Sequence, residues 1–143
     1  MARVLVIDDE PDVLLLCRVN LEHAGHQVLM AASGAEGMEL ARSERPDVIV
    51  LDLMMPQMDG YDVLEQLSGD AGTSGVPVLV LTARTRAEDR MRGWRAGAAG
   101  YLTKPFAPVS LTADVDRLEH MTSAQRDSYR AVALRALASE GVA

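Results

Sequence analysis

The stretch Val48-Ile49-Val50-Leu51-Asp52 is a short apolar run, rich in β-branched residues, that ends on a single carboxylate. Such a run is typical of a strand buried on both faces, as the strands of a parallel sheet are. Pro56 follows closely and disfavours a helix that starts directly after the strand, which weakens the interpretation of Asp52 as a simple helix cap. In an open parallel sheet, ligands bind just beyond the carboxyl ends of the strands, so Asp52 is a candidate for chemistry.

Four other short apolar segments have the same character, and a helical segment follows each strand. The other predicted strands are 4–7, 28–31, 78–81 and 100–103. The predicted helices begin at or near Pro11, Ser33, Tyr61, Arg86 and Pro108. Five strands each followed by a helix, with short connections, predict an α/β domain: a doubly wound, flavodoxin-like sheet of five parallel strands in the order 2-1-3-4-5, with helices on both faces.

Composition limits the class of protein. A chain of 143 residues suits one domain, and its net charge of −7 offers no basic surface for direct nucleic acid binding. Cys17 is the only cysteine, so no intrachain disulfide is possible, and its place in an apolar helical pattern favours a buried side chain. The apolar run after Met1 is too short for a signal peptide or a membrane span, so a cytoplasmic protein is expected.

Thirteen of the 14 basic residues are arginine, and the only lysine is Lys104. A genome that favours arginine codons explains the bias without any function. A site that keeps lysine against that bias is one that needs a compact charge on a flexible stem.

The predicted strand ends carry most of the candidate functional residues. They are Asp8 and Asp9 after the first strand, Asp52 after the third, Thr82 at the end of the fourth and Lys104 after the fifth. In a parallel sheet these positions lie along one edge, and two carboxylates about 4 Å apart repel by roughly 4 kcal/mol at an effective dielectric near 20. A cation must offset that repulsion. Mg²⁺ suits such a site, because it binds hard oxygen ligands and needs only a small number of carboxylates when a phosphoryl group is bound with it.

Asp52 is the group we expect to accept the phosphoryl group. No cysteine stands at a strand end, and carboxylates are known phosphoryl acceptors. Asp8 and Asp9 are adjacent and suit the metal, whereas the lone Asp52 suits attack. Lys104 would neutralise phosphoryl oxygens, and Thr82 could donate a hydrogen bond to one of them.

Residues 4 to about 121 resemble a receiver domain of the two-component response regulator family. The motifs are Asp8-Asp9-Glu10, the run from Asp52 to Asp59-Gly60, Thr82-Ala83, and the run from Tyr101 to Lys104-Pro105. The resemblance implies that Asp52 is the phosphoacceptor and that Asp9, Asp52 and the backbone carbonyl of Met54 ligate Mg²⁺, with Asp8 acting through water. It further implies that Thr82 and Lys104 bind the phosphoryl group and that the Lys104–Pro105 peptide bond is cis.

The family also implies a switch and a set of partners. Thr82 moves toward the phosphoryl group and Tyr101 fills the space, which reshapes the surface of the helix from Arg86, the fifth strand and the helix from Pro108. Trp94, in the first of those helices, is expected in the core. The partners would be a sensor histidine kinase or phosphotransfer protein and a downstream protein or output domain, with a homodimer possible. The chain would not be an enzyme beyond its own phosphorylation and slow dephosphorylation.

Two features depart from common family patterns. Met54 lies two residues after Asp52, where the family uses a side chain to orient attacking water, so a long-lived phosphoaspartate is expected. Ala98-Ala99-Gly100 precedes Tyr101, where regulators with winged-helix outputs often carry acids. Dimers paired through such acids are therefore in doubt.

Residues 122–143 form a predicted helical extension to the receiver domain of residues 1–121. Thr122 and Gln125 have the spacing of a capping box, which predicts a fresh helix to about Ser139. An apolar stripe is expected at Tyr129, Val132, Ala133, Ala136 and Leu137. The extension could fold on its own receiver, pair with a second copy or lead toward an output domain.

Three rival functions are weaker. A phosphatase with an aspartyl-phosphate commonly has a second aspartate where this chain has Met54, and a nucleotide-binding domain would need a glycine-rich loop where acids stand after the first strand. A phosphorylation-independent interaction module remains the alternative. His23, His26 and His120 are expected at the surface or at helix ends.

Overall fold

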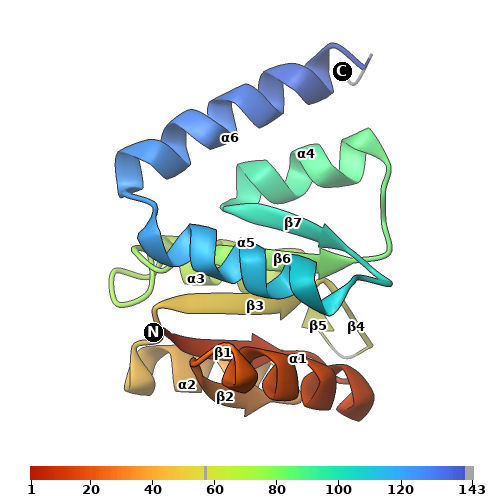
Figure 1. The fold of residues 1–143 in the computed structure, drawn as a ribbon. Coiled ribbons are helices and arrows are strands. Elements are labelled where there is room, and N and C mark those ends of the chain that lie inside the picture. Colours follow the sequence, from red (N-terminus) through yellow and green to blue (C-terminus); the bar gives the residue numbers. More distant parts are fainter. Residues whose placement is uncertain (57, 141–143) are drawn as a thin grey trace.

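The computed structural model describes residues 1–56 and 58–140, and its centre is a parallel sheet of five strands (Figure 1). The strands are β1 (Arg3–Ile7), β2 (Gln27–Ala31), β3 (Val48–Asp52), β6 (Val78–Thr82) and β7 (Gly100–Thr103). Their order is β2-β1-β3-β6-β7, with every neighbouring pair parallel. The flavodoxin-like order predicted from the sequence is confirmed.

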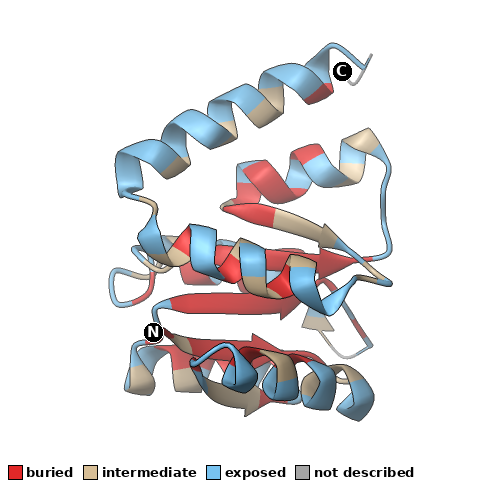
Figure 2. Ribbon diagram, viewed as in Figure 1, coloured by how far each residue is buried: buried red, intermediate tan, exposed pale blue. Residues whose placement is uncertain are grey.

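Alternation along the strands creates two cores. Leu5, Ile49, Leu51 and Val80 face one side of the sheet, whereas Val6, Val50 and Leu79 face the other. Helices α2 (Gly34–Glu44), α3 (Gly60–Gly69) and α4 (Ala87–Ala96) cover the first side. Helices α1 (Pro11–His23) and α5 (Pro108–His120) cover the second. Because both faces are covered, the central strands are buried along their length (Figure 2).

The segment after β3 is more ordered than the loop that the sequence predicts. Met54–Met55 (β4) and Met58–Asp59 (β5) form a short antiparallel pair. Gly60 then starts α3 in close contact with the preceding chain, since a Cβ at this position would lie 2.4 Å from the Cα of Leu53. Glycine is therefore required for this close approach of two backbone segments.

Helix α6 (Ser123–Ala138) follows α5 after a break in direction (Figure 1). The predicted capping box is present, because Thr122 Oγ1 accepts from Gln125 N and Gln125 Oε1 accepts from Thr122 N. Of the predicted apolar stripe, Leu137 is buried and Ala133 is half-buried, whereas Val132 is 57% exposed. The inward face instead includes Leu134, and α6 packs on α4. Residues 141–143 of the predicted extension lie outside the described residues.

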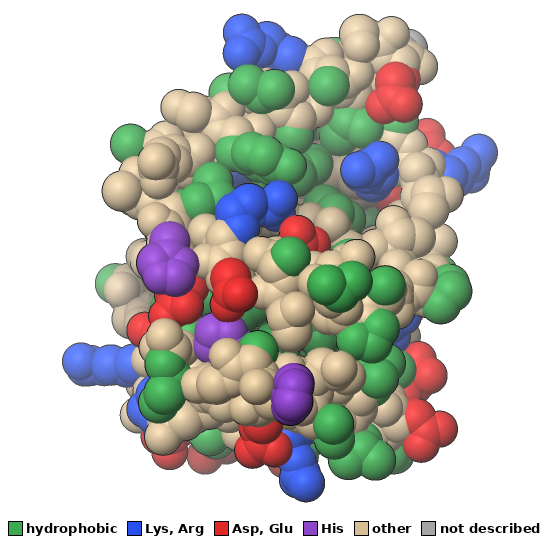
Figure 3. Space-filling model, in the orientation of Figure 1, with side chains coloured by type: hydrophobic (Ala, Val, Ile, Leu, Met, Phe, Trp, Pro, Cys, Tyr) green, Lys and Arg blue, Asp and Glu red, His purple; other side chains and the backbone are tan. Residues whose placement is uncertain are grey.

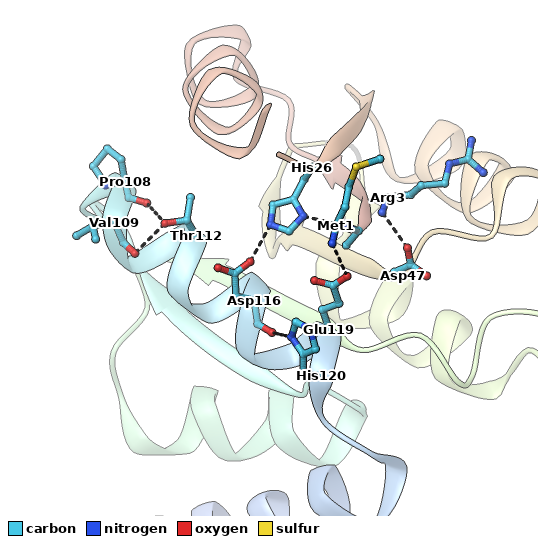
Figure 4. A network of polar contacts seen from close by, with 11 residues as sticks. Met1, Arg3, His26, Asp47, Pro108, Val109, Thr112, Asp116, Glu119 and His120 are labelled. Carbon is cyan, nitrogen blue, oxygen red and sulfur yellow. Dashed lines mark hydrogen bonds and ion pairs between the residues drawn. The ribbon is translucent and has the colours of Figure 1, made fainter. Parts of the chain in front are cut away.

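His26 is buried and lies between α1 and β2, so the expectation of a surface or helix-end residue is wrong at this position. The residue is only 6% exposed, with Nδ1 accepting a 2.9 Å hydrogen bond from Ala2 N and Nε2 lying 2.8 Å from Asp116 Oδ1 (Figure 4). Since Ala2 N–H must donate to Nδ1, the ring proton is assigned to Nε2, which donates to Asp116. A buried polar ring is tolerated here because both of its nitrogens are paired.

Within the described part of the chain, none of the helices is long and apolar enough to cross a lipid bilayer.

Candidate functional site

The carboxyl edge of the sheet brings together side chains from three neighbouring strands. Asp8 follows β1, Asp52 ends β3 and Thr82 ends β6, and all three are at most 2% exposed. Lys104 follows β7, and its backbone N donates a 2.9 Å hydrogen bond to the carbonyl of Thr82. The edge predicted from the sequence is therefore assembled in the structure.

A common local device fixes these side chains. Asp8 Oδ1 accepts from Glu10 N, and Asp52 Oδ1 accepts from Met54 N, each at 2.9 Å. Thr82 Oγ1 accepts from Arg84 N at 3.0 Å. In each case a short polar side chain binds the backbone N–H two residues on, as Asp and Thr commonly do in turns. The second oxygen of each carboxylate and the hydroxyl proton of Thr82 are left to interact with other groups.

Lys104 reaches the second oxygens of both buried carboxylates. Its Nζ lies 2.9 Å from Asp8 Oδ2, 3.3 Å from Asp52 Oδ2 and 3.3 Å from Glu10 Oε1. Burial opposes the charge of the ammonium, but the hydrogen bond to Asp8 and the charges of Asp8 and Asp52 outweigh it and raise the pKa of Lys104. The Lys104–Pro105 peptide bond is cis.

The acids outnumber this one cation. Carboxylate oxygens of Asp8, Asp9, Glu10 and Asp52 all lie within 4.8 Å of one another. Burial raises the pKa of Asp8 above its usual value, against the hydrogen bonds from Glu10 N and Lys104 that favour its charge. Glu10 was not among the predicted site residues, although it continues the acidic run after the first strand and its carboxylate reaches Lys104.

This donor set fits a hard divalent cation. The clustered ligands are all carboxylate oxygens, and four carboxylates against one ammonium leave a formal charge of −3. Mg²⁺ prefers such oxygen ligands and typically uses only one or two carboxylates, with water and phosphate oxygens completing its shell. The chain thus carries an acidic pocket whose ligands fit Mg²⁺.

Two hollows open beside the segment that follows β3. One, of about 370 Å³, is lined by Asp9, the start of α2 and residues of the β4–β5 segment. The other, of about 440 Å³, lies between Met54 and the arginines Arg84 and Arg92. Met54 is 48% exposed, so an apolar and oxidisable side chain forms part of the rim next to Asp52.

Tyr101 lies apart from the acids, on the α4 side of the sheet. Its ring centroid is 5.6 Å from that of Trp94, which is buried as predicted. Its hydroxyl is buried beside Gly93, and burial raises the pKa of that hydroxyl. The structure therefore joins Asp8, Asp9, Asp52 and Lys104 in one cluster with Thr82 beside it, and places Tyr101 between the sheet and α4.

A flavodoxin-like domain with an acidic pocket and one lysine at the carboxyl edge of its sheet has the architecture of a signalling receiver. The family model for the response regulator receiver domain matches residues 4–116. The chain belongs to this family, and its class is that of the response regulators of two-component signal transduction.

Individual relatives agree with this assignment. The protein PilH of Pseudomonas aeruginosa is 45% identical over 111 residues, which are 78% of this chain and 92% of PilH. The response regulator MprA of Mycobacterium tuberculosis is 41% identical over 133 residues, 93% of this chain but 56% of MprA. A DNA-binding transcriptional regulator of Synechocystis, RpaA, is 43% identical over 122 residues, 85% of this chain and 51% of RpaA. The chain thus spans nearly all of one relative and about half of the other two.

Solved structures give the same result. The chemotaxis protein CheY4 of Vibrio cholerae superposes with a TM-score of 0.79 at 35% identity, over 82% of this chain and 98% of CheY4. A response regulator from Chloroflexus aurantiacus gives 0.79 at 32% identity, over 84% and 98% of the two chains. The likeness covers the receiver fold.

Proposed function

We propose that this chain is a phosphorylation-dependent signalling switch in which Asp52 accepts a phosphoryl group from a sensor histidine kinase or a phosphotransfer protein. The observation that carries the proposal is the setting of Asp52: it is buried, its Oδ1 is held by Met54 N and its Oδ2 lies 3.3 Å from Lys104 Nζ. The hydrogen bond from Met54 N holds Oδ1 in place. Oδ2 faces the ammonium of Lys104, which would bind the phosphoryl group after transfer.

The transfer is a substitution at phosphorus. Asp52 Oδ2 forms the new P–O bond while the P–N bond to the donor imidazole breaks. The imidazole leaves with the electron pair of that bond and takes up a proton. Lys104 is able to exchange its contact with Asp52 for phosphoryl oxygens, since charge-assisted hydrogen bonds to phosphate are strong.

Mg²⁺, when bound, would neutralise charge on the carboxylates and on the transferred group. Asp8, Asp9 and Asp52 would hold it together with the backbone carbonyl of Met54, directly or through water. Asp8 and Asp52 are oriented for this role by their backbone hydrogen bonds.

Thr82 is the group that would report phosphorylation to the rest of the domain. Its Oγ1 already accepts from Arg84 N, so its O–H proton can be donated to a phosphoryl oxygen. The movement of Thr82 toward that oxygen would make room for Tyr101, and the surface of α4, β7 and α5 would change. A downstream protein or an output domain would then bind this surface, and we propose that it does so in the cytoplasm, where response regulators generally act.

Met54 bears on how long the signal lasts. A methionine cannot hydrogen-bond an attacking water well, so we propose slow hydrolysis of the phosphoaspartate. We propose no enzymatic activity beyond the phosphorylation and slow dephosphorylation of the chain itself. Residues 1–121 would be the receiver unit and residues 122–143 its extension, and a homodimer is compatible with this arrangement.

Intact-protein mass spectrometry after incubation with acetyl phosphate and Mg²⁺ tests the proposal. We expect one added phosphoryl mass on the wild type, none without Mg²⁺ and none on the Asp52→Asn variant. Size-exclusion chromatography of the same samples would show whether phosphorylation drives self-association. Absence of added mass on the wild type would refute the proposal and favour a phosphorylation-independent interaction module.

A further inference from the structure

Three aromatic side chains form a row from the sheet to helix α6. Trp94 stands in the middle, with its centroid 5.6 Å from that of Tyr101 and 5.7 Å from that of Tyr129. The interplanar angles are 51° and 47°, within the tilted arrangements that aromatic pairs favour. Tyr101 belongs to β7, Trp94 to α4 and Tyr129 to α6. The row therefore links the predicted switch residue to the C-terminal helix.

The place that Tyr101 occupies depends on a glycine. A Cβ at Gly93 would lie 1.4 Å from Tyr101 Oη, so any other residue at 93 would exclude the ring from this position. The hydroxyl is buried and has no hydrogen-bond partner among residues 1–56 and 58–140. A buried donor without a partner is unfavourable, which makes this position of the ring one that a modest change can empty.

Helix α6 is attached along one face. Arg130 donates to the carbonyls of Gly97 and Ala98, at the end of α4, over 3.3–3.4 Å. Leu137 is buried in the core on the α4 side, and the Arg117 guanidinium lies 5.4 Å from the ring centroid of Tyr129. Hydrophobic side chains gather in the zone between α6 and α5, with basic side chains beside them (Figure 3). The remaining surface of α6 is exposed, so this helix can separate from α4 without opening the sheet.

We propose that Tyr101, Trp94 and Tyr129 form an aromatic relay through which phosphorylation of Asp52 loosens α6 from α4. In this arrangement α6 is an intramolecular strap over the Trp94 face of α4, and phosphorylation exposes that face. The proposal rests on the function proposed above for Asp52 and Thr82. When Thr82 turns toward the phosphoryl group, Tyr101 leaves the position beside Gly93, Trp94 loses one of its two aromatic neighbours, and the contact of Tyr129 weakens.

Trp94 is the only tryptophan in the chain, so its fluorescence reports the relay directly. The protein is incubated with acetyl phosphate and Mg²⁺, its phosphorylation is measured by intact mass, and hydrogen exchange and emission are recorded on the same sample. We expect the emission of Trp94 to shift and the amides of residues 123–138 to exchange several-fold faster, with neither change in Asp52→Asn. Phosphorylated protein that shows unchanged exchange in α6 would overturn the proposal.

A second arm needs no phosphoryl group. Gly93→Ala places a methyl group where the Tyr101 hydroxyl lies, and Gly69→Ala is the matched control because a Cβ there meets nothing within 4 Å. We expect faster exchange in α6 for unphosphorylated Gly93→Ala, with the amides of β1 and β3 still protected, and no change for Gly69→Ala. Unchanged exchange in Gly93→Ala would contradict the relay.

The two arms separate the two proposals. Loosening of α6 in Gly93→Ala without phosphorylation of the wild type supports the relay and refutes the role of Asp52. Phosphorylated wild type in which the amide exchange of α6 is unchanged supports the role of Asp52 and refutes the relay. If Gly93→Ala fails to fold, Tyr101→Ala takes its place, since removing the ring empties the same position and predicts the same loosening.

Discussion

Replacement of Lys104 by methionine tests whether one ammonium allows two carboxylates to lie buried in the site. Nζ lies 2.9 Å from Asp8 Oδ2 and 3.3 Å from Asp52 Oδ2. The two carboxylates lie within 4.8 Å of each other. At that separation two unit charges repel by about 3.5 kcal/mol when the effective dielectric is near 20. Methionine keeps an unbranched stem and removes the charge, so the variant leaves two buried like charges without a cation.

The folded state of the Lys104→Met variant can relieve this repulsion by binding a proton, which limits the loss of stability. Protonating a carboxyl group of ordinary pKa costs about 1.4 kcal/mol per pH unit, or about 4 kcal/mol at pH 7 and about 1.4 kcal/mol at pH 5. Burial already raises the pKa of Asp8 in the wild type, and loss of Lys104 raises it further. The folded state of the variant then binds a proton that the unfolded chain does not, so the stability of the variant falls as the pH rises through this range.

We therefore expect Lys104→Met to lower the free energy of unfolding by about 3–4 kcal/mol at pH 7 and by about 1 kcal/mol at pH 5. Urea unfolding of both proteins in EDTA, at several pH values between 5 and 7, measures the difference. Arg86→Met is the control, because Arg86 is highly exposed and the Glu88 side chain with which it forms an ion pair is also exposed. A loss of the same size at pH 5 and pH 7 would refute the electrostatic explanation and point to lost packing of the lysine stem.

Two further variants test the site, and one labelling experiment tests the core beneath α1. Met54→Asn places an amide beside the phosphoaspartate that can orient water, so the label should be lost several-fold faster; an unchanged lifetime in a mass time course would contradict the role given to Met54. Lys104→Arg keeps the charge but replaces a compact ammonium by a planar fork, so Mg²⁺-dependent phosphorylation should slow several-fold, as initial rates would show. Burial, reinforced by the charge of Asp8, raises the pKa of the Cys17 thiol to about 12. Cys17 should thus resist iodoacetamide at pH 8 until urea unfolds the chain, and rapid labelling of native protein would show that α1 opens.

The sheet and the polar residues at its carboxyl edge were predictable because both follow from local patterns. A buried parallel strand is a short apolar run, and the residue that ends the run must lie at the carboxyl edge. Asp8, Asp52 and Thr82 therefore needed no tertiary information. Glu10 was missed because its contact depends on the reach of Lys104, which approaches from 94 residues away.

Positions decided by distant partners were not predictable in this way. His26 has an unremarkable sequence context, and its burial is set by Ala2 and by Asp116, 90 residues further along the chain. The apolar residues of α6 alone left open what the helix packs against, and Val132 is exposed in the structure. Carbonyl groups at the end of α4 attract Arg130, and this polar contact helps to set which side of the helix turns inward.

The geometry also explains why one lysine persists in a chain that otherwise uses arginine. Three carboxylates from residues 8, 10 and 52 approach a single nitrogen at 2.9–3.3 Å. An ammonium has three donors around one atom and can meet three acceptors that belong to different segments. A guanidinium spreads its donors over a plane and suits paired oxygens of one carboxylate or phosphate. A point charge at the end of a flexible stem can also shift, with a small movement, from these carboxylates to a phosphoryl group on Asp52. Lys104 would therefore balance the charge of the carboxylates in the unphosphorylated protein and that of the phosphoryl group in the proposed phosphorylated state.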